Sequence, residues 1–343
     1  MAWKLYKENA LEHLISRLDE GSYSNGHHPY LQSRFVKPLL NFFPHGGEYL
    51  AEYEQDGKIL CALMVTEYSK ISAGAYVDGV SQISLNYIDH QLSVDELRLI
   101  IQSLFKALPK YYLAINFELQ DPDLVDIEKF QALKNTIVKT CALNTSIPAA
   151  VSFEDYWSER PKGVRKDIAR RLRALEREST EIKYSVRDCV DAIHEGFSRY
   201  CDLEGAGWKG DNGTALTETN NQGQFYKQVM TEFSRTGEGK IHELYFNDKI
   251  VASLLAIENE EMIIVMKTAY DESVSKYSPG RLLDYYMLQS VLTEKNAKKM
   301  ENYTNASTND QKWFPRVREM YDVTVYRSSW AKQLARLKHR LRA

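Results

Sequence analysis

The sequence predicts a mixed α/β fold arranged as two consecutive domains. Its 343 residues favour two domains over one. Helical and strand patterns alternate in the order helix, strands, helix, strand, which is typical of a mixed α/β fold. This order occurs on both sides of a break near Pro148. We therefore expect two mixed, mostly antiparallel sheets flanked by helices, over residues 1–148 and 149–328, followed by a helix at 329–343.

The predicted first domain begins with two helices, over 10–19 and 33–43, where apolar residues recur at helical spacing. The segment EYLAEYEQDGKILCALMVTEY then predicts a β-hairpin, because Asp56-Gly57 separates two apolar runs. Three further elements complete the domain: a strand near 70–76, an amphipathic helix at 94–108 and a strand at 112–117.

The predicted second domain repeats the plan. A charged helix at 162–177 comes first, with its apolar residues on one face: Val164, Ile168, Leu172 and Leu175. Two helices follow at 191–200 and 225–235. The segment KIHELYFNDKIVASLLAIENEEMIIVMKTAYDE then predicts three strands with turns at Asn247-Asp248 and Asn259-Glu260. A helix after Ser278 and a strand at 300–304 end the repeat.

Composition excludes several classes of protein. The net charge of −3 gives no general attraction for nucleic acid. The first residues lack the apolar core of a signal peptide, and the longest apolar runs are too short to span a bilayer, so a cytoplasmic location is expected. The four cysteines lack metal-ligand spacing and predict buried free thiols, so no metal is expected.

The polar segment 270–276 separates an apolar strand from a helix that begins Ser278-Pro279-Gly280-Arg281. Serine suits an N-cap and proline the first helical position, and glycine lets a ligand approach the backbone. The free N–H groups of a first helical turn bind anions, and Lys276 and Arg281 add positive charge. The segment therefore predicts an anion site. A capped helix without a ligand is the alternative.

The same segment resembles a known family. The order strand, polar loop, glycine-bearing helix start, helix and strand is similar to the core of the GNAT superfamily of N-acyltransferases. The wider pattern resembles its CelD-like branch, which is associated with bacterial exopolysaccharide and cellulose synthesis and is related to double-domain Fem-like transferases. The resemblance covers about 153–327, and the N-terminal half matches only in architecture, as a degenerate first domain. The motifs that carry it are Trp208-Lys209-Gly210, Gly213-Thr214-Ala215-Leu216, Lys267-Thr268-Ala269-Tyr270-Asp271, Ser278-Pro279-Gly280 and Leu282-Leu283.

The resemblance implies acyl-CoA, with acetyl-CoA as the expected form, as the co-substrate. The residues implied to bind it are Lys267, Thr268, Ala269, Lys276, Ser278, Pro279, Gly280, Arg281 and Leu282. The chain departs from the family at Tyr277 and Leu282, where relatives carry Gln or Arg and a small residue. Fewer backbone N–H groups would then face a diphosphate, so a thioester on an acyl carrier protein is an alternative donor.

Acyl transfer to an amine needs a base, an oxyanion donor and an acid for the leaving thiolate. The resemblance implies that the strand ending at Lys267–Ala269 supplies the oxyanion donor and that Tyr303 is the acid, although a strand tyrosine is more often a packing residue. Asp271 and Glu243 are the candidate bases. Glu243 alternates with Ile241 and Tyr245, and apolar neighbours would raise its pKa; solvent exposure is the alternative.

Four residues are expected to bind a small-molecule or glycan-linked acceptor: Trp208, Lys209, Tyr270 and Lys312. An indole suits a sugar face, and a lysine suits a phosphate. Relatives carry a Tyr-Lys pair where this chain has Gln311-Lys312, which weakens the case for Lys312.

The sequence thus predicts an acyltransferase that acts on a sugar or amino-sugar acceptor in polysaccharide or envelope assembly. A Fem-like transferase that uses aminoacyl-tRNA and a non-catalytic binding subunit are the alternatives. The basic C-terminal helix has one apolar stripe, formed by Trp330, Leu334, Leu337 and Leu341. This stripe predicts packing on the first domain or contact with an anionic membrane surface.

Overall fold

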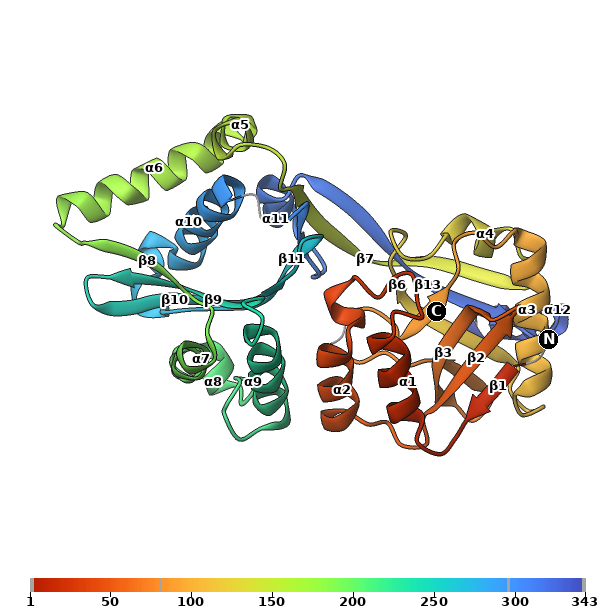
Figure 1. Ribbon diagram of the computed structural model, residues 1–343. Helices are drawn as coiled ribbons and strands as arrows, with labels where there is room; N and C mark the ends of the chain where they lie inside the picture. Colours follow the sequence, from red (N-terminus) through yellow and green to blue (C-terminus); the bar gives the residue numbers. More distant parts are fainter. Residues whose placement is uncertain (1–2, 81, 295–296, 341–343) are drawn as a thin grey trace. The chain divides into compact units, whose positions relative to one another are not determined.

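The computed structural model describes residues 3–80, 82–294 and 297–340, and the chain divides into two compact units (Figure 1). Unit 1 consists of Met1–Leu143 and Arg318–Ala343, and unit 2 consists of Asn144–Val317. The chain enters unit 2 within strand β7 (Thr136–Pro148) and leaves it within β13 (Arg316–Tyr326). The second boundary therefore lies before 328, because β13 from Tyr321 onward pairs with a strand of unit 1.

The sheet of unit 1 has the strand order β1-β2-β3-β4-β6-β13, with β5 on β3. Neighbouring strands are antiparallel, except that β4 and β6 are parallel. The strands are β1 (Trp3–Tyr6), β2 (Tyr49–Gln55), β3 (Lys58–Ser69), β4 (Ser72–Ala75), β5 (Asn86–Ile88) and β6 (Ala114–Gln120). The helices are α1 (Ala10–Asp19), α2 (Ser33–Phe42), α3 (Val94–Ala107), α4 (Ile127–Gln131), α12 (Ser329–Arg340) and the 3₁₀ turn η1 (Pro29–Leu31).

Local signals in the sequence account for much of unit 1. The β2–β3 turn has positive φ at both central residues, 52° at Asp56 and 78° at Gly57, as a tight hairpin requires. Helix α3 begins with a reciprocal capping box between Ser93 and Glu96. The apolar face of α3 then packs on the sheet in one core with residues of β3, β6 and β13.

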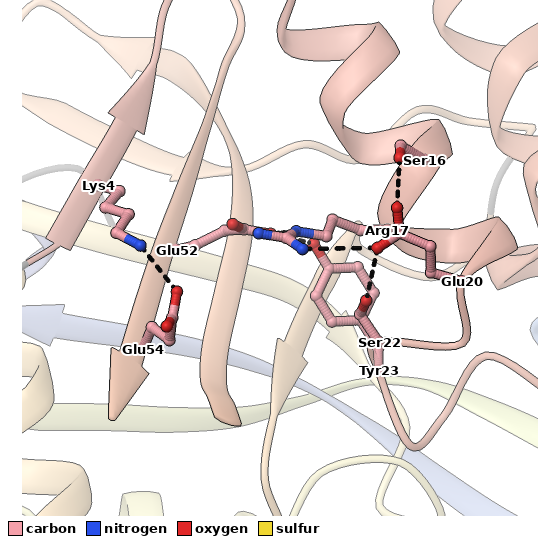
Figure 2. A network of polar contacts seen from close by, with 8 residues as sticks. All are labelled: Lys4, Ser16, Arg17, Glu20, Ser22, Tyr23, Glu52 and Glu54. Atoms are coloured by element: carbon pink, nitrogen blue, oxygen red, sulfur yellow. Dashed lines mark hydrogen bonds and ion pairs between the residues drawn. The ribbon is translucent and has the colours of Figure 1, made fainter. Parts of the chain in front are cut away.

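A polar network joins α1 to the sheet of unit 1 (Figure 2). The carboxylate of Glu52 on β2 is buried; it accepts a hydrogen bond of 2.7 Å from the hydroxyl of Tyr23 and lies 3.4 Å from Nε of Arg17. Arg17 also contacts Glu20, at 3.5 Å. A buried carboxylate is costly unless it is paired and hydrogen-bonded, so this network fixes α1 and the following loop against β2.

The sheet of unit 2 contains the end of β7 and continues in the order β12-β11-β10-β9-β8. Its remaining strands are β8 (Ile182–Arg187), β9 (Gly239–Phe246), β10 (Lys249–Glu258), β11 (Met262–Tyr270) and β12 (Lys299–Asn302). Its helices are α5 (Phe153–Glu159), α6 (Lys162–Arg177), α7 (Val190–Gly205), α8 (Trp208–Asp211), α9 (Asn221–Ser234), α10 (Pro279–Glu294), α11 (Thr308–Trp313) and the turn η2 (Glu272–Tyr277). Figure 1 shows α7 and α9 on one face of this sheet and α6 and α10 on the other.

The two units share one connectivity. In unit 1, β2, β3 and β4 are antiparallel, α3 follows, and β6 returns parallel to β4. In unit 2, β9, β10 and β11 are antiparallel, α10 follows, and β12 returns parallel to β11. The predicted fold class, a mixed α/β architecture with mostly antiparallel sheets flanked by helices, is confirmed.

Two details complete the comparison with the sequence. The predicted apolar face of α6 is confirmed, since Ile168 and Leu175 are buried and Val164 and Leu172 pack against the same core. The prediction that all four cysteines are buried is wrong: Cys61 and Cys201 are buried, Cys141 is half-buried, and Cys189 is exposed because it precedes the first turn of α7. Within the described residues, no helix combines the length and apolarity needed to cross a membrane.

Candidate functional site: a pocket between two diverging strands

Strands β11 and β12 run side by side and then part. They are paired in parallel from Met262–Lys299 to Val265–Asn302. Strand β12 ends there, whereas β11 continues to Tyr270. A pocket of about 540 Å³ opens beyond the last pair, next to the start of α10. Its lining residues are Val265, Met266, Lys267, Thr268, Tyr270, Ser275, Ser278, Gly280, Arg281, Asp284, Asn302, Tyr303, Thr304, Asp310 and Phe314.

A β-bulge lies where β11 begins to line the pocket. Leu255 of β10 pairs with Lys267, but the next residue, Ala256, pairs with Val265. Met266 is therefore an extra residue on β11 without a partner in the register. Bulges bend a strand and turn its backbone groups out of the ladder, and they are frequent beside active sites. This is the strand segment from which the sequence predicts the oxyanion donor.

The loop before α10 supplies few free N–H groups. Ser278 has a left-handed conformation (φ 47°, ψ 63°), and its carbonyl accepts hydrogen bonds from the N–H groups of Arg281 (3.0 Å) and Leu282 (3.1 Å). Pro279 has no N–H group. Among the described residues of this turn, Gly280 is left with the N–H group that has no acceptor. The start of α10 thus offers one free N–H group to a ligand rather than several.

The two cations predicted at this loop are engaged elsewhere. Arg281 lines the pocket, but its guanidinium lies 3.1 Å from Asp284 and 2.8 Å from Asp310. Lys276 is exposed, lies 3.6 Å from Glu178 and is outside the pocket lining. The positive charges of Arg281 and Lys276 are therefore compensated by carboxylates and are less available to bind a diphosphate.

Lys267 is the cation that the pocket keeps without an ion pair among the described residues. Its Nζ lies 5.3 Å above the ring of Tyr226. Burial, reinforced by the charge of Lys209, lowers the pKa of Lys267. Neighbouring Thr268 lines the pocket, whereas Ala269 is buried and pairs with Ser253 of β10.

The predicted catalytic residues separate into one in the pocket and two outside its lining. Tyr303 is buried and lines the pocket. Asp271 caps the turn η2, accepting from Ser273, and pairs with Lys249 at 2.7 Å. These contacts outweigh its burial and lower the pKa of Asp271.

The expectation of a raised pKa for Glu243 is wrong. The side chain is fully buried, but on the side of α7, where it accepts from Arg187 (2.7 Å), Arg199 (2.8 Å) and Tyr245 (2.9 Å). Burial alone would raise the pKa of Glu243, and these hydrogen bonds reverse the direction and lower it. A carboxylate with both oxygens engaged is a poor proton acceptor, so Glu243 does not suit the role of general base.

The predicted acceptor-binding residues are spread over three places. Tyr270 is exposed and lines the pocket. Lys209 pairs with buried Glu204, which also accepts from the N–H of Leu216 at 2.7 Å. Trp208 begins α8, and its side chain lies outside the described part of the chain. Lys312 is exposed on α11 and is not among the lining residues.

Pro279 and Leu282 are buried, and Leu282 belongs to the core beneath α10. Their side chains therefore serve packing.

Two pocket carboxylates, Asp284 and Asp310, are absent from the sequence prediction. Burial raises the pKa of Asp284, and the opposing charge of Arg281 does not cancel the rise. Asp310 has a lowered pKa, because the hydrogen bonds from Arg281 and Ser307 outweigh its burial. Ser307 and Asp310 form a capping box at the start of α11, so the S-x-x-D pattern of the sequence could have located Asp310. Asp284 carries no such signal.

A wider cleft of about 780 Å³ lies in unit 1, beside the loops that carry His27, His90 and Asp123. Across the described ranges, no group of three His, Cys, Asp or Glu side chains is placed to hold a metal ion.

Comparisons with known proteins agree with this geometry. Residues 162–303 match the family model described as an acetyltransferase (GNAT) domain. Residues 162–303 are therefore similar to a GNAT-superfamily acetyltransferase domain. Most of the pocket lining lies within this range, and Thr304, Asp310 and Phe314 follow it. A search of curated proteins found no match.

Several solved structures align with most of the chain. The crystal structure of FemX aligns with a TM-score of 0.60 and 8% identity, over 94% of this chain and 97% of that one. The C-terminal domain of a protein described as a lysylphosphatidylglycerol synthetase from Agrobacterium fabrum gives 0.58 and 10%, over 95% of both chains. L-PGS from Bacillus licheniformis gives 0.54 and 13%, over 94% of both. At these identities the likeness shows a common fold.

Proposed function

We propose that unit 2 transfers an acyl group from a thioester to an amine or hydroxyl of a sugar-linked acceptor, within bacterial exopolysaccharide or envelope assembly. The parting of β11 and β12 after the Val265–Asn302 pair carries this proposal. It leaves a slot beside free strand backbone, into which the narrow arm of an acyl thioester fits. The polysaccharide role rests on the resemblance of the motifs around Trp208 and Ser278 to the CelD-like branch.

The pocket fits one end of acyl-CoA better than the other. The slot and the bulge at Met266 suit the thioester arm. The start of α10 offers one N–H group, and Lys267 is the cation in the pocket that forms no ion pair among the described residues. We therefore assign donor binding to the backbone of Lys267 and Thr268, to Gly280 and to the side chain of Lys267. Bound there, the thioester supplies an activated acyl group.

The reaction breaks the acyl–sulfur bond, forms an acyl–nitrogen or acyl–oxygen bond, and moves one proton from the acceptor to the departing thiolate. Tyr303 lines the pocket, and we assign to it the return of that proton to sulfur. Asp284 is our candidate to take the proton from the acceptor, because it lines the pocket and its pKa is raised. Tyr270 and Lys209 remain candidates for acceptor binding.

A second function is favoured by the incomplete anion site. A donor whose acyl group is delivered by a large carrier does not need a diphosphate cradle at α10. Aminoacyl-tRNA is one such donor, and the resemblance to FemX over both units supports considering it. Acyl carrier protein is another.

Thermal unfolding with coenzyme A, acetyl-CoA and longer acyl-CoA tests the first function. A ligand at a hundred times its Kd adds about 2.7 kcal/mol to the free energy of unfolding. Gly280→Val should remove the shift, because the new side chain occupies the pocket wall, where an added Cβ meets only the ring of Tyr270 at 3.5 Å. Gly163→Val is the matched control: it is also the second residue of a helix, with nothing within 4 Å.

A shift with one acyl form that Gly280→Val abolishes and Gly163→Val retains would establish the donor. No shift with any CoA, together with acyl transfer from acyl carrier protein or aminoacyl-tRNA, would replace acyl-CoA by the carrier-borne donor. No transfer from any donor would overturn the proposal.

A further inference from the structure

Helix α12 packs on unit 1 with its small side chains and exposes its large ones. Ala331 is 4% exposed, and Ala335 lines a groove against the sheet. Trp330, Leu334 and Leu337 are 59%, 42% and 56% exposed. These three residues follow helical spacing, so they form one stripe along the helix. A helix that served only to pack on the sheet would bury such side chains, because burial removes their apolar surface from water and is favourable.

Further exposed apolar residues lie at the same end of the unit 1 sheet. The N–H of Leu113 donates to the carbonyl of Ile71 (2.7 Å), and the N–H of Arg327, three residues before Trp330, donates to the carbonyl of Leu113 (2.9 Å). Ile71 is exposed, as are Tyr68 and Tyr111 nearby on β3 and before β6. Six of the nine large exposed hydrophobic residues of the described chain therefore belong to this end: Tyr68, Ile71, Tyr111, Trp330, Leu334 and Leu337. We call these six residues the apolar rim.

Basic side chains surround the apolar rim. Lys332 and Arg336 lie on α12, and Lys332 donates to the carbonyl of Lys134 at 2.9 Å, which brings the loop before β7 beside the helix. The exposed lysines at this end are Lys70, Lys110, Lys134 and Lys139. Two of the carboxylates here are engaged: Glu118 accepts from Tyr68, and Asp322 accepts from the N–H of Leu119. Glu67 is exposed. The surface is cationic, although the chain as a whole has a net charge of −3.

We propose that the apolar rim and its lysines and arginines form a surface that binds an anionic lipid bilayer. Aromatic and leucine side chains ringed by Lys and Arg match the boundary between lipid headgroups and acyl chains. The attraction of basic residues to anionic headgroups adds to apolar burial. A second copy of the chain does not fit as well, because a twofold contact would bring these basic side chains against one another.

Sedimentation with vesicles tests the proposal on the full chain. Vesicles of equal parts phosphatidylglycerol and phosphatidylcholine should bind the protein, and pure phosphatidylcholine should bind it at least tenfold more weakly. Leu334→Ser with Leu337→Ser should weaken binding at least tenfold, and Arg336→Glu about fivefold, with a smaller salt dependence. All three residues are exposed, so the melting temperature should be unchanged.

Leu99→Ser is the matched control, because Leu99 is 60% exposed on α3, outside the apolar rim. Binding should survive this change. The fluorescence of Trp330 should move to shorter wavelength with anionic vesicles, and Trp330→Phe should remove that change. Equal binding by the Leu334/Leu337 variant and wild type would overturn the proposal. A second result would also overturn it: a wild-type protein that binds no vesicles but forms a dimer, which the Leu334/Leu337 variant converts to monomers. That result would assign the apolar rim to contact with a second copy.

Discussion

Two ionisable side chains of the pocket have pKa values displaced toward neutral pH. Burial raises that of Asp284 and lowers that of Lys267. Groups displaced in this way exchange protons more readily near neutrality and are frequent in active sites. Their positions on α10 and β11 place them on two walls of one pocket. This pair defines the site more closely than the loop motif does.

Tyr303→Phe should lower kcat by about 100-fold and leave KM within about threefold, because it removes a proton donor and keeps the ring that fills the buried position. Steady-state kinetics with the donor identified by thermal unfolding measures both constants. Tyr285→Phe on α10, whose ring packs on Phe153 and Trp157, is the control and should leave both constants unchanged. Equal kcat for Tyr303→Phe and wild type would show that Tyr303 is not the general acid.

His242 makes the stability of unit 2 depend on pH. Its ring is buried, its Nδ1 lies 2.7 Å from the hydroxyl of Tyr184, and its Nε2 has no hydrogen-bond partner among the described residues. Burial, with the nearby charge of Lys240, lowers the pKa of His242 to about 3 from an unfolded value of 6.5. The unfolded chain therefore binds more protons between these pH values, so stability is complete above pH 6.5 and falls as the pH drops toward 3.

His242→Asn should remove this part of the acid sensitivity. Between pH 6.5 and 5, the free energy of unfolding of wild type should fall faster than that of the variant, by up to about 1.4 kcal/mol per pH unit. Urea unfolding across that range measures the difference. His90→Asn, at an exposed position, should keep the wild-type slope. If the free energy of unfolding of wild type and of His242→Asn fell equally with pH, His242 would not be the source of this acid sensitivity.

At the scale of elements, the sequence predicts those whose signals are local. The helices α1, α3 and α6, the Asp56-Gly57 hairpin and the β9–β11 meander follow periodicity, caps and turn residues. Strands β7 and β13 are missing from the prediction, because their pairing partners are distant in sequence. The same reason hides the contact of Arg281 with Asp310, which is fixed only when α11 packs beside α10. The Ser278-Pro279-Gly280-Arg281 motif could be recognised in the sequence. The pairing of Arg281 with two carboxylates could not.

Helix α9 should be intolerant of a side chain at Gly223. A Cβ there would lie 1.7 Å from the carbonyl oxygen of Thr217, because the preceding loop is held against the first turn by Asn220. Gly223→Ala should lower the free energy of unfolding of unit 2 by about 2–3 kcal/mol. Gly163→Ala on α6, where nothing lies within 4 Å, should leave it equal or raise it by up to about 1 kcal/mol. Chemical denaturation compares the two, and equal stabilities would contradict the close contact.

At the scale of the whole molecule, unit 1 depends on the last part of the chain. Strand β13 covers β6 and adds Val323 and Val325 to the core of unit 1. A chain ending at Val317 should therefore lose the cooperative unfolding of unit 1 and aggregate, because β6 would be left as an open apolar edge. A chain ending at Arg327 keeps β13 and should stay folded. Circular dichroism and solubility measure both, and a soluble, folded chain ending at Val317 would contradict this dependence.

The chain passes from unit 1 to unit 2 in β7 and returns in β13, and this path sets the order in which the two units can fold during synthesis. Strand β6 emerges early, yet its partner β13 is made only after all of unit 2. At about 5–20 residues per second, the wait is roughly 10 to 40 s, long enough for unit 2 to fold first. The nascent first half must then keep its unpaired strand away from other chains. Synthesis in the presence of chaperones should accordingly favour the yield of native protein, with nascent unit 1 as their client.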